Sequence, residues 1–137
     1  MGKYFNIKEL SYSRIAAEKG INNTPNGDAK RKLELLIDKC LDPIRQVYGK
    51  PITVSSGYRN YLLNQLVGGK DTSQHLKGEA ADIVGNNEKE TRRIFEIAKQ
   101  GNYDQLLFER DKKGNVWVHI SYKAEGNRKQ CIDNYIV

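Results

Sequence analysis

A regular alternation of apolar and polar residues over positions 105–121 constrains the fold of this chain more than any other feature. Two runs, residues 105–109 and 116–121, alternate with the two-residue period of a strand, and Lys112-Lys113-Gly114 lies between them. A loop of this length with glycine last fits a type I turn closed by a left-handed residue. The two runs are therefore predicted to form a hairpin.

The register of this hairpin separates its two faces. Asp111 is predicted to pair with Asn115, Glu109 with Trp117, Leu107 with His119 and Gln105 with Ser121. One face of the hairpin then carries nearly all the polar chemistry and consists of Gln105, Leu107, Glu109, Trp117, His119 and Ser121. The opposite face is wholly apolar and consists of Leu106, Phe108, Val116, Val118 and Ile120. An apolar face must pack on other elements, so we expect helices behind the sheet and functional groups in front, which is an α+β architecture.

The rest of the chain supplies these further elements. Helices are expected over residues 6–19, 28–48 and 87–100, with a helical turn over 60–67, and strands are expected over 52–55 and 80–84. Pro43 predicts a kink or break near Leu41, because proline cannot donate a backbone hydrogen bond. The segment after Tyr122 has little pattern and is expected to be loosely ordered.

Composition narrows the class of protein. The 137 residues suit one domain, and eight Tyr, three Phe and one Trp argue against a disordered chain. No apolar run approaches the about 20 residues of a membrane span, and the first residues lack the apolar segment of a signal peptide. Cys40 and Cys131 form no CxxC motif, which favours two reduced thiols in a protein made in the cytoplasm. The net charge of +6 favours an anionic partner: nucleic acid, anionic lipid or anionic cell-wall polymer.

The two histidines of the chain have informative surroundings. His75 begins the pattern H-x-x-G-x-A-x-D, which ends at Asp82, and His119 lies in Trp-Val-His on the second strand of the hairpin. Gly78 allows the backbone to turn between His75 and the strand of Asp82. Each of these residues alone is more often structural, but together they offer two imidazoles and one carboxylate. A catalytic zinc site uses three protein ligands and an open position, so His75, Asp82 and His119 are predicted to bind one zinc ion.

The sequence resembles the zinc D-Ala-D-Ala carboxypeptidase family, particularly its short phage-associated members. The matching stretches are ELSYSRIAAEKGINNTP, LDPIRQVYGKPITVSSGYRN, LNQLVGGKDTSQHLKGEAADI, DQLLFE and WVHISY, within residues 9–122. The resemblance implies the same three zinc ligands and a small antiparallel sheet flanked by helices, as in hedgehog-type domains. It also implies that Arg59, in S-S-G-Y-R, holds a substrate carboxylate, which a guanidinium can bind with two parallel hydrogen bonds.

Peptide hydrolysis also needs a group that moves protons at the scissile bond. Many relatives have a glutamate three residues before the last histidine, but this chain has Val116 there. Glu109 is the best candidate for a catalytic base, because the register places it diagonal to His119, with about 7–8 Å between their Cβ atoms. Asp104 and Glu79 are weaker candidates. Substrate contacts are expected from Ser73, Gln105 and Trp117. The alternative interpretations are a strand-end carboxylate for Glu109 and a structural role for Arg59.

These features predict a single zinc peptidase domain over residues 1–137. We expect it to hydrolyse peptide bonds in the stem peptides of bacterial peptidoglycan, as a D-Ala-D-Ala carboxypeptidase or as an endopeptidase of the endolysin type. The alternative is a non-catalytic, zinc-stabilised module that binds the cell wall, which need not retain a carboxylate at position 109.

Partners and location follow from the same features. The basic residues are scattered over the chain, so nucleic acid is not an expected partner. Membrane insertion is not expected either, and a monomer is. The missing signal peptide fits a phage or prophage enzyme made in the cytoplasm and released by a holin-type protein; a host enzyme without its export signal is the other possibility.

Overall fold

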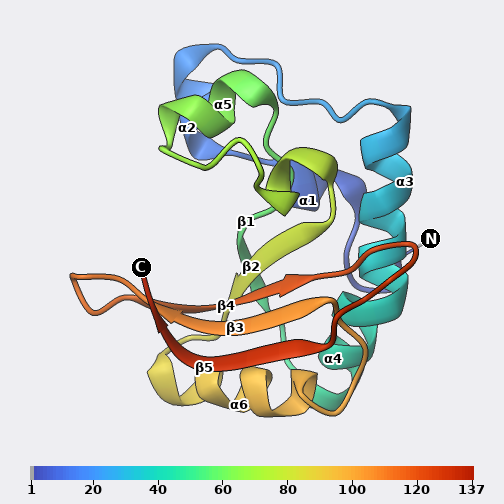
Figure 1. Cartoon of the computed structure of the whole chain (residues 1–137), viewed down its shortest axis with the longest axis vertical. Helices are drawn as coiled ribbons and strands as arrows, with labels where there is room; N and C mark the ends of the chain where they lie inside the picture. Colours follow the sequence, from blue (N-terminus) through green and yellow to red (C-terminus); the bar gives the residue numbers. More distant parts are fainter. Residues whose placement is uncertain (1) are drawn as a thin grey trace.

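The computed structural model describes residues 2–137, and its centre is a five-stranded sheet (Figure 1). The strands lie in the order β1 (Thr53–Ser56), β2 (Ala80–Val84), β4 (Val116–Ser121), β3 (Gln105–Arg110) and β5 (Gln130–Ile136). Neighbouring strands are antiparallel except for β5, which runs parallel to β3 at one edge. The expected α+β fold with a small, mainly antiparallel sheet is confirmed.

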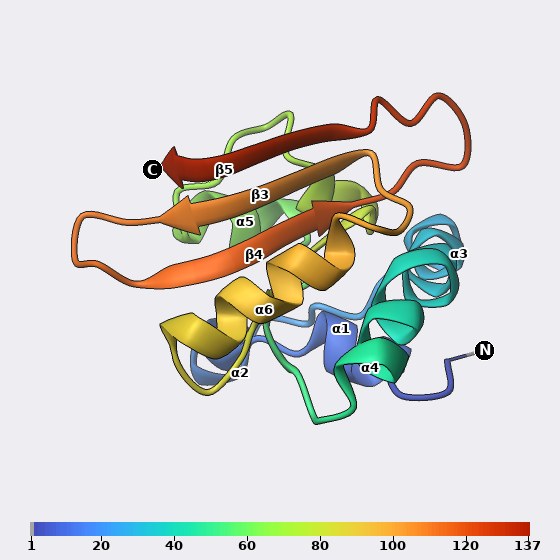
Figure 2. The same ribbon diagram turned by 90° about the horizontal axis from the view of Figure 1, so that it is seen from below.

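The hairpin of β3 and β4 has the predicted register. Glu109 lies opposite Trp117, and Leu107 lies opposite His119. The helix α6 (Glu88–Ala98) lies along one face of β3 and β4, as Figure 2 shows. The side chains on that face are almost entirely buried: Leu106, Phe108, Val118 and Ile120. The opposite face, which carries Glu109 and His119, is turned away from α6.

β5 contradicts the expectation that the segment after Tyr122 is loosely ordered. Its backbone pairs with β3 from Gln105 to Arg110, although six of its seven residues are exposed. An edge strand that buries so little apolar surface carries no alternating pattern. The sequence pattern therefore did not predict this strand. It is held by backbone hydrogen bonds, which leave no pattern in the side chains.

The helical segment before the sheet is longer than any other, and it contains one irregular turn. The helix α3 (Gly27–Leu36) continues through a π-helical turn, η1 (Ile37–Leu41), into α4 (Asp42–Tyr48). The backbone N–H of Asp42 donates to the carbonyl of Ile37, five residues earlier. Pro43 has no N–H to donate, so the regular helical ladder is interrupted there. A kink or break was predicted near Leu41; the structure has a π turn there, and the helix continues through it.

The first helical segment differs from its prediction. A single helix was expected over residues 6–19, but α1 (Ile7–Ser11) and α2 (Arg14–Lys19) are separate. Tyr12 and Ser13 have extended backbones between them, and the Ser13 hydroxyl accepts a hydrogen bond from the N–H of Ala16. A serine that caps a new helix competes with continuation of the old one, which explains the break.

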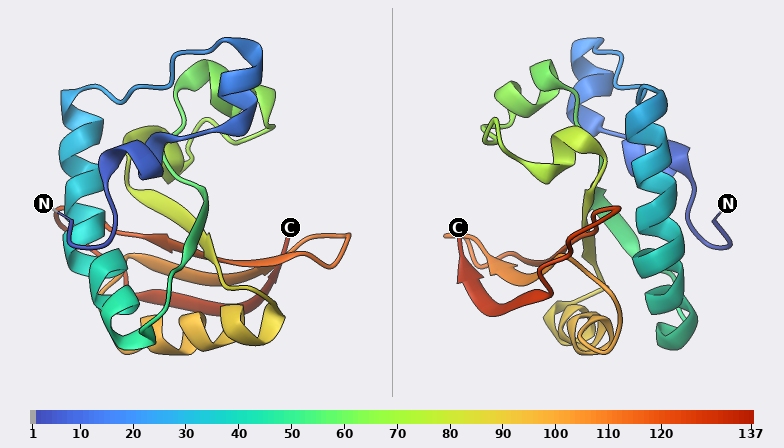
Figure 3. Two further views of the ribbon diagram at one scale, coloured as in Figure 1. Left: turned by 180° about the vertical axis from the view of Figure 1, so that it is seen from behind. Right: turned by 45° about the vertical axis from the view of Figure 1, so that its right-hand side comes forward.

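Two short helical segments lie on the side of the sheet opposite α6. α5 (Tyr61–Leu66) confirms the helical turn expected over residues 60–67, and η2 (Gln74–Lys77) is a 3₁₀ turn. Figures 1 and 3 show α5 beside α2, well separated from α6. No helix within residues 2–137 is long and apolar enough to span a membrane.

Candidate metal centre

His75 is held by the turn η2 with one ring nitrogen directed toward the sheet. The Ser73 hydroxyl accepts a hydrogen bond from the N–H of His75, and Gly78 ends the turn with a φ of +78°. The Nδ1 atom of His75 lies 2.7 Å from the carbonyl oxygen of Gly57. A carbonyl can only accept a hydrogen bond, so Nδ1 carries the proton and Nε2 keeps its lone pair. His75 is therefore prepared to bind a metal through Nε2.

Asp82 and His119 complete a cluster of three potential ligands. They lie opposite each other on the paired strands β2 and β4. Asp82 Oδ1 lies 3.0 Å from His119 Nδ1 and 3.4 Å from His75 Nε2. The ligand atoms of the three residues all lie within 4.8 Å of one another. The structure thus brings together the predicted set of two imidazole nitrogens and one carboxylate oxygen, which fits a zinc site with an open fourth position.

The electrostatics of the cluster favour a charged carboxylate. Burial alone would raise the pKa of Asp82, but the two imidazoles outweigh it and hold that pKa below its usual range. Burial also opposes the charge of His119, yet Asp82 and Glu109 raise the pKa of His119 overall. Two imidazole nitrogens that face one partly buried carboxylate are arranged as they would be around a cation.

Glu109 lies beside the cluster, on β3. Its Oε1 atom is 3.7 Å from His119 Nδ1 and accepts a hydrogen bond of 3.1 Å from the indole N–H of Trp117. Burial is the main reason that the pKa of Glu109 is raised, and the charge of Asp82 adds to it. The predicted diagonal register therefore places this carboxylate next to the potential metal ligands.

Arg59 approaches the same cluster from the segment after β1. Its Nη2 atom donates to the Ser73 hydroxyl at 3.3 Å, and its Nε atom is buried without a partner among the described residues. Burial lowers the pKa of Arg59, while the charges of Asp82 and Glu109 raise it. A buried N–H without an acceptor is costly, so an anionic ligand would relieve a deficit at this position.

A cleft of about 410 Å³ opens over these residues. We call it the metal cleft; its lining includes Arg59, His75, Asp82, Gln105, Glu109, Trp117 and His119. Ser73 does not line this cleft but contacts Arg59, and it lines a neighbouring hollow. Lys70 and two residues of the C-terminal segment, Tyr135 and Val137, also line the cleft, and the sequence offered no sign of them.

The two weaker candidates for a base do not reach the cluster. Asp104 is fully buried, and both of its carboxylate oxygens accept hydrogen bonds from Arg128. Glu79 faces the neighbouring hollow and does not line the metal cleft. The carboxylate of Glu109 is therefore the one from the sequence-predicted set that adjoins the potential ligands.

Comparisons with known proteins agree with this geometry. The profile of a family described as Peptidase M15 matches residues 3–121. A curated relative, the zinc D-Ala-D-Ala carboxypeptidase of Streptomyces albus G, is 34% identical over 68 residues, which are 49% of this chain. The match covers 26% of that relative, so the chain spans about a quarter of its length. The resemblance noted from the sequence motifs is confirmed.

Proposed function

The chain belongs to the Peptidase M15 family, and we propose that it is a zinc-dependent peptidase that hydrolyses peptide bonds of bacterial peptidoglycan. One observation carries this proposal. A buried carboxylate, that of Glu109, lies 3.7 Å from a nitrogen of the His75–Asp82–His119 cluster. A site that only binds zinc for stability has no need of a second carboxylate, outside the ligand set, at that distance.

The ligand set would be His75 Nε2, an oxygen of Asp82 and His119 Nδ1. Two neutral imidazoles and one carboxylate would leave the ion a net positive charge. Zinc held there would polarise a peptide carbonyl and lower the pKa of a water molecule. The hydrogen bond from His75 to Gly57 would keep the ring in its ligating orientation and tautomer.

Glu109 would move the protons of the reaction. Its Oε1 atom would accept a proton from the attacking water and then donate it to the leaving amine. Trp117 would position this carboxylate through its indole N–H. The alternation of β3 and β4 places both side chains on the cleft side of the sheet.

Arg59 would bind a carboxylate of the substrate. Its Nε atom, which is buried and has no partner within residues 2–137, and its place in the cleft support this role. Ser73, which accepts a hydrogen bond from Arg59, would position the guanidinium, and Gln105 and Trp117 would contact the peptide.

In its finer form, the proposal is a single-domain, monomeric enzyme that acts as a D-Ala-D-Ala carboxypeptidase or as an endopeptidase of the endolysin type. This proposal is tested by digesting purified peptidoglycan with the zinc-loaded protein. Mass spectrometry then identifies the new termini of the products. Loss of one terminal D-Ala indicates a carboxypeptidase, and freed stems or split dimers indicate an endopeptidase. A protein with stoichiometric zinc and no products contradicts the proposal and supports a cell-wall-binding module.

A further inference from the structure

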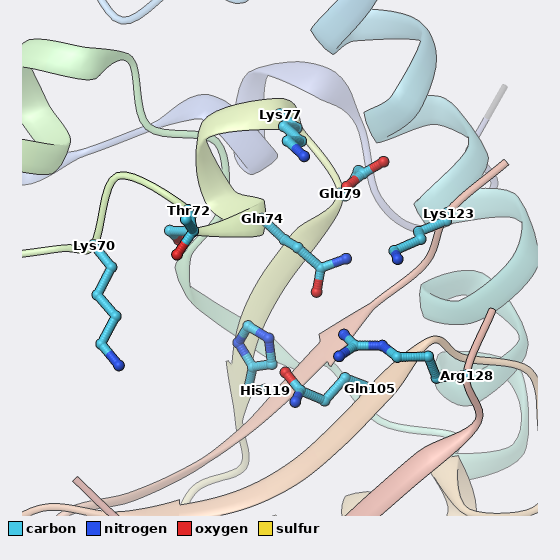
Figure 4. A pocket seen from close by; sticks show the side chains of 10 residues that line it. Lys70, Thr72, Gln74, Lys77, Glu79, Gln105, His119, Lys123 and Arg128 are labelled. Carbon is cyan, nitrogen blue, oxygen red and sulfur yellow. The ribbon is translucent and has the colours of Figure 1, made fainter. Parts of the chain in front are cut away.

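A second hollow adjoins the metal cleft and is rimmed by basic side chains. It has a volume of about 510 Å³, and Lys70, Lys77, Lys123 and Arg128 line it (Figure 4). We call it the lysine basin. Figure 4 shows Lys123 and Arg128 reaching in from one side, Lys70 from the other side, and Lys77 above them. Lys70 follows α5, Lys77 lies in η2, and Lys123 and Arg128 lie in the loop between β4 and β5, so only the fold brings their charges together.

The basin carries an excess of positive charge. Among residues 2–137, no acidic side chain forms an ion pair with Lys70, Lys77 or Lys123. Arg128 is already neutralised, because its guanidinium lies 2.8 Å from the buried carboxylate of Asp104. Glu79 is the one acidic side chain in the lining. Three ammonium groups facing a single carboxylate favour an anionic ligand.

The basin and the cleft meet at the potential metal site. His119, Gln105 and Lys70 line both hollows. Of these two hollows, Glu109 and Arg59 line the cleft alone, whereas Lys77 and Lys123 line the basin alone. An extended peptide whose scissile bond lies at the metal would therefore occupy the cleft with one half and the basin with the other.

We infer that the lysine basin binds a carboxylate of an acidic peptide substrate, in the half of the peptide that lies outside the metal cleft. This inference rests on the proposed function. A substrate carboxylate would form charge-assisted hydrogen bonds with Lys77 and Lys123. Lysine ammonium groups are point charges on flexible side chains. The basin would therefore recognise a negative charge on the substrate without requiring one exact orientation of the carboxylate. Arg59 and the basin would thus recognise two different carboxylates, one on each side of the scissile bond.

A pair of synthetic stem peptides tests the inference. The two peptides differ only at one acidic residue in the half expected to occupy the basin, which carries either a free carboxylate or a carboxamide. The wild-type protein is expected to prefer the acid by about tenfold in kcat/KM, mainly through KM, because the interaction stabilises the bound substrate and the transition state alike. The preference is expected to shrink at high salt, because ions screen exposed charges.

Two double variants with the same change of charge separate the basin from the overall charge. Lys77→Gln with Lys123→Gln is expected to remove most of the preference for the acid and to leave hydrolysis of the amide nearly unchanged. Lys89→Gln with Lys113→Gln, on α6 and at the tip of the hairpin, is expected to retain the preference. The inference is overturned if the two double variants change the preference for the acid equally. It is also overturned if the basin variant loses kcat/KM equally for both peptides.

Binding to the Glu109→Gln variant separates this inference from the proposed function. Calorimetry with the same two peptides does not require turnover. One outcome is that the wild type hydrolyses neither peptide while the variant binds the acid about tenfold more tightly than the amide. In that case the proposed function is wrong and the inference about the basin is supported. If both peptides are hydrolysed and bound equally well, the inference about the basin is overturned and the proposed function is supported. Failure to bind either peptide also overturns the basin.

Discussion

At the scale of single residues, groups outside the ligand set orient the side chains of the site. The carbonyl of Gly57 holds the proton of His75 on Nδ1, and the indole of Trp117 holds Glu109 beside the cluster. Gly57 itself packs so closely on the backbone of Leu10 that a Cβ atom would clash with it. The glycine therefore lets the segment after β1 come near enough to position the first histidine.

Replacement of Glu109 tests its proposed role. The variant Glu109→Gln is expected to retain zinc and to lose about 10²–10⁴-fold in turnover, because the amide cannot accept the proton of the attacking water. Metal content by atomic emission and the rate of peptide hydrolysis check this. Glu125→Gln, in an exposed loop, is the matched control and is expected to behave as the wild type. Unchanged turnover in Glu109→Gln removes this residue from the role of base.

Gly78 tests the backbone that leads from His75 to β2. It has a φ of +78°, and an added Cβ would lie 2.5 Å from the carbonyl oxygen of Ala29. Gly78→Ala is expected to lower the free energy of unfolding by about 2–4 kcal/mol, through backbone strain and overpacking. Gly114→Ala is the control, because Gly114 has a φ of +89° and open space around it. It is expected to cost about 1 kcal/mol in urea unfolding. Equal costs would show that the contact with Ala29 is unimportant.

At the scale of elements, Asp104 connects β5 to the rest of the sheet. Its carboxylate accepts hydrogen bonds from the backbone and side chain of Arg128, and its carbonyl accepts one from the N–H of Gln130. Burial alone would raise the pKa of Asp104, but hydrogen bonds from Arg128 and Gln74 outweigh it and lower the pKa to about 2. The buried carboxylate thus holds the loop that leads into β5, and the C-terminal segment beyond it lines the metal cleft.

The sign of this pKa shift predicts a pH dependence of stability. The Asp104 pKa is lower in the folded chain, so its contribution is present above the unfolded value of about 4. The contribution is lost as the pH falls from about 4 to 2. At pH 7, Asp104→Asn is expected to lower the free energy of unfolding by about 1–2 kcal/mol, a modest value because Arg128 is half exposed. The difference from the wild type should shrink over that acidic range.

Denaturant unfolding at several pH values measures this effect. Asp133→Asn is the matched control, because Asp133, on β5, pairs at the surface with Arg92 of α6. It is expected to cost less than about 0.5 kcal/mol. A difference between Asp104→Asn and the wild type that does not vary with pH would contradict the assignment of the low pKa to Asp104.

At the scale of the whole molecule, the metal site joins parts of the chain that are distant in sequence. His75 belongs to η2, while Asp82 and His119 belong to the central strands β2 and β4. A bound ion would link the segment that carries α5 and η2 to the sheet. Binding to the folded state alone would also stabilise the fold as a whole.

Removal of the metal is therefore expected to lower thermal stability. A chelator should lower the Tm of the zinc-loaded protein by about 5–10 °C, and added zinc should restore it. His119→Ala serves as the control, because it lacks one ligand and should respond little to either addition. Differential scanning fluorimetry measures the shifts. A wild-type Tm that responds to neither chelator nor zinc would contradict a metal that stabilises this fold.

The hairpin and its two faces could be predicted from the sequence because strand alternation is a local property. The same alternation placed Glu109 and His119 on one face, and cross-strand pairing then made them neighbours. The break between α1 and α2 was missed, because the capping hydroxyl of Ser13 outweighed the apolar periodicity. β5 was missed because its pairing involves the backbone and leaves most of its side chains exposed.

The sequence by itself determined the α+β class, the apolar face under α6 and the residue types that can bind zinc. Each of these follows from periodicity or from chemistry that a short segment carries in full. Only the tertiary structure decided which nitrogen of His75 faces the cluster, and that three lysines gather beside it. Those features depend on groups far apart in the chain, such as Gly57 and Lys123, and the packing of loops on the sheet sets their distances.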